Sequence, residues 1–146
     1  MPKLTEPQQR WIDALRSGKY KQGKKRLQAE HTVGSASAWT IGVTEDRFCC
    51  LGVACHLFKD ELDLTVRRFL TEVQYCGSST MPPRAVVDYL DLVSDTGAPR
   101  IQISINDSSR HLMTLNDERG MSFEEIADLL ESGDYFTTGD THVEPN

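Results

Sequence analysis

The longest apolar run of the chain extends from Phe48 to Phe58 and contains three of its four cysteines. The run has no Asp, Glu, Lys or Arg, so leaving it in water would expose much apolar surface. We interpret it as a strand that ends at about Cys49 and turns directly into a helix that begins near Cys50. This helix is expected to be buried on most sides, and the rest of a small domain must then pack around it.

The length of the chain, 146 residues, fits a single domain, which we place at residues 1–132. The acidic residues 133–146 are expected to form a flexible C-terminal tail. No run of about 18 apolar residues could cross a membrane, and the N-terminus lacks the apolar core of a signal peptide. These features predict a protein of the cytoplasm, where the four cysteines would remain free thiols.

Charge is unevenly distributed along the chain. Residues 1–28 carry eight Lys or Arg against two acids, a local charge of +6, so the rest of the chain sums to −12 for a net charge of −6. Residues 116–146 hold nine acids against Arg119. The basic arm from Lys19 to Arg26 is a candidate surface for an anion, whereas the overall pI near 5.2 argues against a dedicated DNA-binding protein.

Capping signals and apolar spacing predict the helices. Thr5 with Gln8 forms a capping-box pattern that opens a helix ended by Gly18, and Ser122 with Glu125 opens another over residues 123–131. A third helix is expected from Met81-Pro82-Pro83 until Gly97 and Pro99, and a short one through Leu112 and Leu115 to Gly120.

Strands are expected at 24–30, 38–43 and 46–50, with Trp39 and Ile41 on the apolar face of the resulting sheet. Residues 62–76 fit a helix in their first part and a strand in their last, and 101–105 alternate as a strand. The predicted fold is therefore α+β, a single domain in which a small antiparallel sheet is packed by four to five helices.

Four segments together resemble a known family. They are residues 11–22, residues 48–55, Met81-Pro82 with 87–92, and Leu115-Asn116-Asp117 followed by 122–127. They are similar to small, mostly uncharacterised proteins encoded by tailed bacteriophages and prophages. This chain differs by a longer insertion between Gln28 and Arg47. The resemblance implies a viral protein that works inside a bacterium, and it implies no catalytic activity.

The first amides of a helix that begins near Cys50 would lack intrahelical partners and would favour an anion. Gly52 would let a ligand oxygen approach them, or it would merely allow close helix packing. Tyr20 and Gln22 either line the basic loop or pack on the first helix, and Asn116 and Asp117 either cap helices or orient a ligand. The predicted ligand-binding residues are Lys19, Tyr20, Gln22, Lys24, Cys50, Gly52, Asn116 and Asp117.

A cysteine at a helix N-terminus has its thiolate favoured, so Cys50 is also a candidate nucleophile with His111 as its base. The alternative is that Cys50 is an ordinary buried apolar residue. A zinc site formed by Cys50, Cys55, His56 and Cys76 is not predicted, because the spacing is wrong for a knuckle and the two helical cysteines point in different directions. No cofactor is expected.

Three functional hypotheses follow. The first is a phage accessory protein that acts in the cytoplasm of the bacterial host by stoichiometric binding, in host takeover or against host defence, of a small anionic ligand such as a nucleotide. The second is a cysteine-dependent hydrolase or transferase that uses Cys50 and His111. The third is a binder or inhibitor of a host protein through the acidic C-terminal surface.

Overall fold

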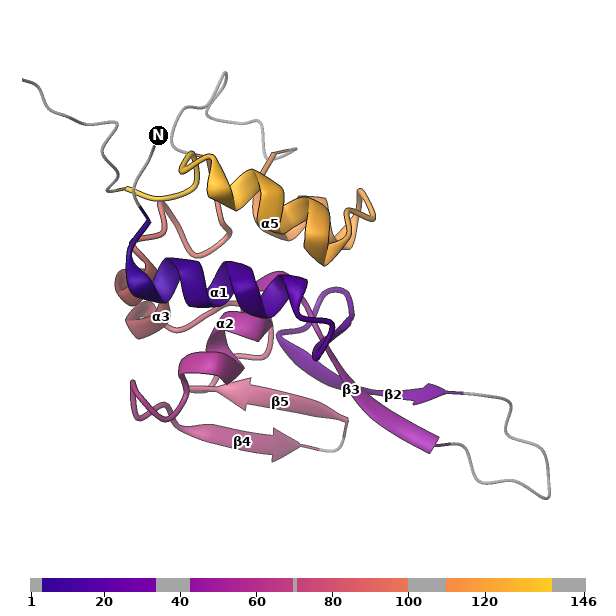
Figure 1. Cartoon of the computed structure of the whole chain (residues 1–146). Coiled ribbons are helices and arrows are strands. Elements are labelled where there is room, and N and C mark those ends of the chain that lie inside the picture. The colour runs from indigo at the N-terminus through magenta and orange to yellow at the C-terminus, as the bar shows by residue number, and fades with distance from the viewer. Residues whose placement is uncertain (1–3, 34–42, 70, 100–109, 138–146) are drawn as a thin grey trace, which may run out of the picture.

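Within the described part of the chain, five helices and five strands form one unit of the predicted α+β class (Figure 1). The computed structural model describes residues 4–33, 43–69, 71–99 and 110–137. The helices are α1 (Glu6–Arg16), α2 (Cys50–Phe58), α3 (Arg84–Leu90), α4 (Leu112–Asp117) and α5 (Phe123–Glu131). The strands are β1 (Lys21–Gln22), β2 (Gln28–Val33), β3 (Val43–Phe48), β4 (Val66–Phe69) and β5 (Glu72–Tyr75). None of the helices in these ranges is long and apolar enough to span a membrane.

The strands form one sheet in the order β1-β3-β2-β5-β4. Three of the four pairings are antiparallel, as predicted, but β1 runs parallel to β3 with Lys21 opposite Arg47. The prediction of a wholly antiparallel sheet is therefore wrong at this edge. A two-residue strand has too few residues to show a periodicity, so its direction is set only by how the chain returns after α1.

The central helix begins and ends as the sequence predicts. Cys49 is the N-cap of α2, in extended conformation directly after β3. Seven of the nine α2 residues are buried, and the Trp11 indole of α1 donates to the Cys50 carbonyl at 2.9 Å. In Figure 1, α2 lies between α1 and the strands, so it occupies the centre of the core.

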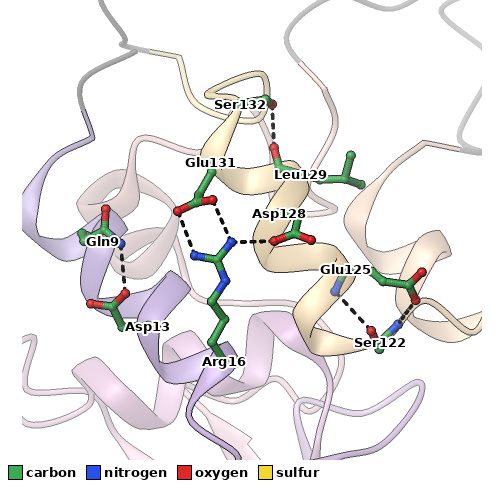
Figure 2. Close-up of polar contacts among 9 residues, drawn as sticks. All are labelled: Gln9, Asp13, Arg16, Ser122, Glu125, Asp128, Leu129, Glu131 and Ser132. Atoms are coloured by element: carbon green, nitrogen blue, oxygen red, sulfur yellow. Dashed lines mark hydrogen bonds and ion pairs between the residues drawn. The ribbon is translucent and has the colours of Figure 1, made fainter. Parts of the chain in front are cut away.

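Helices α1 and α5 pack side by side, and both begin with the predicted capping boxes, Thr5 with Gln8 and Ser122 with Glu125. Figure 2 shows Arg16 reaching from α1 to two acids of α5. Its terminal nitrogens lie 2.7 and 2.8 Å from the Glu131 carboxylate and 2.6 Å from Asp128.

Two of the predicted elements differ in the structure. Residues 66–69 and 72–75 form the hairpin of β4 and β5, so the helix expected in the first part of 62–76 is wrong and the strand expected in its last part is confirmed. Helix α3 ends at Leu90, before Gly97, because Asp91 takes the left-handed conformation at φ 55°. Asp adopts this conformation more readily than most residues with side chains.

The packed chain extends beyond the predicted domain boundary at residue 132. Tyr135 and Phe136, which we assigned to a flexible tail, are buried, and Phe136 forms an isolated bridge with Leu92. The Phe136 ring packs on Trp11 of α1, which the acidic character of residues 133–146 did not indicate. The strand predicted at 101–105 and the sheet positions of Trp39 and Ile41 lie outside the described residues.

Candidate anion-binding pocket

The N-terminus of α2 is closed by protein groups. The amide of Cys50 donates to the Asn116 side-chain oxygen at 3.2 Å, and the amide of Gly52 donates to the Cys49 sulfur at 3.3 Å. A Cβ on Gly52 would lie 1.6 Å from the Leu27 carbonyl oxygen, so no ligand atom fits there. The predicted anion site at Cys50 and Gly52 is therefore wrong, and Gly52 instead allows the helix to pack on the backbone at Leu27.

Asn116 is a fully buried amide that uses all four of its hydrogen-bonding positions. Its oxygen accepts from Gln22 at 2.9 Å and from the Cys50 amide, and its nitrogen donates to the Gly23 carbonyl and to Asp117, each at 2.9 Å. The side chain thereby joins the end of α4, the start of α2 and the loop after β1. Asn116 stabilises the structure, and no polar atom of its amide remains for a ligand.

Asp117 and Gln22 complete the attachment of this loop. The Asp117 carboxylate accepts from the Lys25 amide at 2.8 Å, where the chain passes through a left-handed residue at φ 69°. Gln22 also donates to the Met121 carbonyl at 2.7 Å. Three predicted ligand residues, Gln22, Asn116 and Asp117, are thus brought together, and their contacts fix the path of the basic loop from 22 to 26.

A pocket of about 360 Å³ lies on the outer side of this loop. It is bounded by the basic loop and by the adjacent ends of β2 and β3. The lining residues are Gln22, Gly23, Lys24, Arg26, Ala29, Glu30 and Arg47. Two of the predicted ligand residues, Gln22 and Lys24, line it.

Close packing and strand register shape the pocket. Gly23 donates its amide to the Phe48 carbonyl at 2.6 Å, and a Cβ on Gly23 would lie only 2.8 Å from that of Arg47. Ala29 lies directly opposite Arg47 in the antiparallel pair of β2 and β3. The small Ala29 side chain leaves open the space that Lys24, Arg26 and Arg47 line.

Carboxylates on neighbouring residues position the two arginines. Arg47 Nε lies 2.9 Å from Glu45, and Arg26 Nε lies 3.1 Å from Glu72. The hydrogen bond from Arg26 lowers the pKa of Glu72. Within the described ranges, both terminal nitrogens of Arg47 and one of Arg26 remain without a hydrogen-bond partner. Terminal nitrogens held in this way suit the bidentate binding of phosphate or carboxylate.

Lys19 and Tyr20 belong to a different surface. They line a pocket of about 320 Å³ between α1 and the end of α2, together with Arg10 and Leu57. The Tyr20 hydroxyl lies 3.1 Å from His56 Nδ1, and partial burial raises the pKa of Tyr20 and lowers that of His56. The eight residues predicted as one site therefore separate into the pocket, the closed α2 terminus and this second surface.

The surroundings of Cys50 do not support a nucleophile. Its side chain is fully buried, and burial raises the pKa of the thiol well above its usual value, so it stays protonated at neutral pH. Its sulfur lies 3.9 Å from the Leu112 carbonyl, whereas His111 Nδ1 is 2.8 Å from the Thr96 hydroxyl. No hydrogen bond in the described part of the chain joins Cys50 to His111. The prediction of a low-pKa thiol at this helix terminus is wrong because burial outweighs the helix dipole.

The described residues contain no group of three His, Cys, Asp or Glu side chains that could hold a metal ion. Cys49, Cys50 and Cys55 are buried free thiols, and Cys76 is an exposed one. Burial raises the pKa of Cys49 to about 12, so this thiol also remains protonated near neutral pH.

Five pocket residues were not among the predicted site residues: Gly23, Arg26, Ala29, Glu30 and Arg47. Arg26 was within reach of sequence reasoning because it ends the basic arm. Ala29 and Arg47 are 18 positions apart and meet only through the β2–β3 register. No local pattern specifies that register, so the pairing could not be read from the sequence.

A search of curated proteins and a search of solved structures each give no match. A family model described as "Domain of unknown function (DUF8296)" matches residues 5–134, which include every residue of the pocket and the closed α2 terminus. The chain belongs to this family.

Proposed function

We propose that this protein is a phage-encoded accessory protein that acts in the bacterial host by stoichiometric binding of a small anionic ligand, in host takeover or against host defence. The binding site in this proposal is the pocket lined by Lys24, Arg26 and Arg47. The viral setting rests on the resemblance of the four segments described above. The observation that supports an anionic ligand is the pair of carboxylate-held arginines that line an open pocket.

The pocket also suggests the class of ligand. Its volume of about 360 Å³ falls within the range of about 300–1,000 Å³ typical of small-molecule sites. Glu30 lies in the lining beside the three cations and can accept hydrogen bonds from a hydroxyl or amino group. An anion that also carries hydroxyl or amino groups, such as a nucleotide, matches both features.

The acidic surface of α5 offers less support for binding a host protein. Arg16 already pairs with Asp128 and Glu131, so part of the negative charge of this helix is neutralised within the molecule. The pocket, by contrast, keeps Lys24 without an ion-pair partner in the described ranges.

Calorimetric titration with inorganic phosphate, pyrophosphate and a nucleotide panel at low salt tests the proposal. We expect one ligand per chain, and we expect Arg47→Gln or Lys24→Gln to weaken binding about tenfold or more, since hydrogen bonds to charged groups contribute about 1.5–3 kcal/mol. Lys19→Gln is the matched control, because Lys19 lines the separate surface and its loss should leave the affinity unchanged. Absence of binding for every anion, or equal losses in all three variants, would contradict the proposal.

Alkylation with iodoacetamide separates this binding role from a cysteine-dependent enzyme. At pH 7 the folded protein is expected to gain one adduct, on Cys76, because the other three thiols are buried and two of them lie in or beside the first turn of α2. Peptide mapping by mass spectrometry identifies the labelled residue, and the urea-unfolded protein, which should gain four adducts, is the control. Rapid labelling of Cys50 in the folded protein would restore the enzymatic hypothesis.

A further inference from the structure

The edge strand β4 has properties that the fold does not require. It is the outermost strand of the sheet (Figure 1), on the side opposite β1. All four of its residues are exposed. Val66 and Phe69, exposed by 41% and 40%, are the large exposed apolar side chains of the described residues. Such a strand exposes both its backbone and its apolar side chains to any partner that approaches.

The pairing with β5 shows which backbone groups are free. The amide of Cys76 donates to the Thr65 carbonyl at 2.7 Å, and Val66 to Phe69 pair in the same register with Tyr75 to Glu72. Hydrogen-bonded and non-hydrogen-bonded pairs alternate in an antiparallel ladder, so Arg67 and Phe69 bond toward β5. The amides and carbonyls of Val66 and Arg68 therefore point away from the sheet, where a further strand could bond to them.

The edge also carries one arginine on each of its two faces. Successive residues of a strand point to opposite faces, so Arg67 and Phe69 share one face while Val66 and Arg68 share the other. The Arg67 guanidinium lies 5.0 Å from the centre of the Phe69 ring, and Arg68 is held by Asp46 at 2.5 Å. Each face thus presents one arginine next to one apolar side chain.

This charge pattern excludes a second copy of the chain as a good partner. Outward-bonding residues pair with one another, so an antiparallel register that overlaps three residues of two β4 strands sets Arg67 opposite Arg67 or Arg68 opposite Arg68. Like charges directly opposite one another are destabilising. Charged side chains on an edge strand also prevent aggregation, but that role alone does not require Val66 and Phe69 to be exposed.

We propose that β4 binds an extended acidic segment of a partner protein, which adds to the sheet as a sixth, antiparallel strand. The complementary segment has two adjacent acidic residues flanked by apolar residues, which would meet Val66, Arg67, Arg68 and Phe69. Backbone hydrogen bonds to Val66 and Arg68 give affinity, and the acidic pair selects the partner. This surface lies across the sheet from the anion-binding pocket and does not depend on it.

The experiment uses the whole protein and two capped hexapeptides, Thr-Val-Glu-Glu-Val-Thr and its counterpart with two lysines in place of the glutamates. Amide hydrogen exchange followed by NMR is the readout. We expect the acidic peptide to slow exchange at Val66 and Arg68 at least tenfold and to leave the inward-bonded Arg67 amide little changed. The lysine peptide should have no effect.

Two variants test backbone and charge separately. Val66→Pro removes an outward amide at the first strand position, where proline is tolerated, and should abolish binding without breaking the ladder to β5. The double change Arg67→Glu with Arg68→Glu should reverse the preference toward the lysine peptide, and it serves as the independent test if the proline variant does not fold. Lys24→Gln is the control and should bind the acidic peptide normally.

The proposal is overturned if the acidic peptide at millimolar concentration leaves exchange at Val66 and Arg68 unchanged, or if both peptides act equally. Protection of these two amides in the free protein would mean that the edge is already occupied, which also overturns it. A loss of peptide binding in the Lys24→Gln variant would show that the peptide binds in the pocket and not at β4. Failure of anion binding in the calorimetric titration, by contrast, leaves this result unaffected.

Discussion

Gly52 and Asn116 stabilise the centre of the molecule for opposite reasons. Gly52 has no side chain, and only this allows the first turn of α2 to contact the backbone carbonyl of Leu27. Asn116 has a side chain with two donors and two acceptors, and all of them are used within the buried centre. Together they close the helix terminus at which an anion site was expected.

The substitution Gly52→Ala is expected to lower the free energy of unfolding by about 3 kcal/mol, the upper end of the usual cost of overpacking. The atom that the new methyl group would meet is a backbone carbonyl, which cannot rotate away as the end of a long side chain could. Urea unfolding followed by circular dichroism measures the change.

Gly120→Ala is the control for this prediction. Gly120 has φ 66° but open space around it. Alanine there should therefore lower the free energy of unfolding only by the cost of a left-handed residue, about 1–2 kcal/mol. Equal destabilisation in the two variants would show that the contact with Leu27 is not the cause.

At the scale of elements, α1 and α5 are joined by a contact that responds to pH. Arg16 of α1 donates to Glu131 and Asp128 of α5 (Figure 2). The hydrogen bond from Arg16 lowers the pKa of Glu131 in the folded protein. A carboxyl group with a depressed pKa adds stability above its unfolded pKa, and this contribution is lost as the pH falls through the folded pKa.

Replacing Arg16 with glutamine is therefore expected to reduce stability slightly at neutral pH and not at all in acid, below the folded pKa of Glu131. The effect is small and weakened by salt, because the acidic partners are exposed. Thermal unfolding of both proteins across the acid range measures it. Arg84→Gln, which breaks an exposed pair within α3, is the control. A difference between wild type and Arg16→Gln that stays constant with pH would refute the assignment.

At the scale of the whole molecule, residues 133–137 close the core. Phe136 packs edge to face on Trp11 with ring centres 6.4 Å apart, and the Tyr135 hydroxyl donates to the Arg110 carbonyl at 2.8 Å. The amide of Thr137 donates to the Asp91 carbonyl at 2.6 Å. The end of the described chain thereby connects α1, the turn after α3 and the start of α4.

Phe136→Ala is expected to lower the free energy of unfolding by about 3–5 kcal/mol, as such changes do at other buried aromatic residues. Thr137→Ala changes an exposed neighbour, so its free energy of unfolding should stay within about 0.5 kcal/mol of the wild-type value. Denaturant unfolding of both variants provides the comparison. If Phe136→Ala unfolds like wild type, residues 133–137 do not contribute to the core.

The sequence by itself determined the elements whose signals are local. The capping boxes at Thr5 and Ser122 and the uncharged run after Phe48 located α1, α5 and α2, because a helix is set by residues three and four positions apart. The α+β class followed from the same patterns.

Only the tertiary structure decided how these elements meet. The hydrogen bond from Cys50 to Asn116 spans 66 positions, and Ala29 faces Arg47 through strand register alone. The β4–β5 hairpin arose where the apolar spacing also fitted a helix. Contacts between distant segments depend on the packing of the whole core, so no local pattern encodes them. For this reason the candidate pocket lies beside the basic loop and not at the helix terminus where the sequence predicted it.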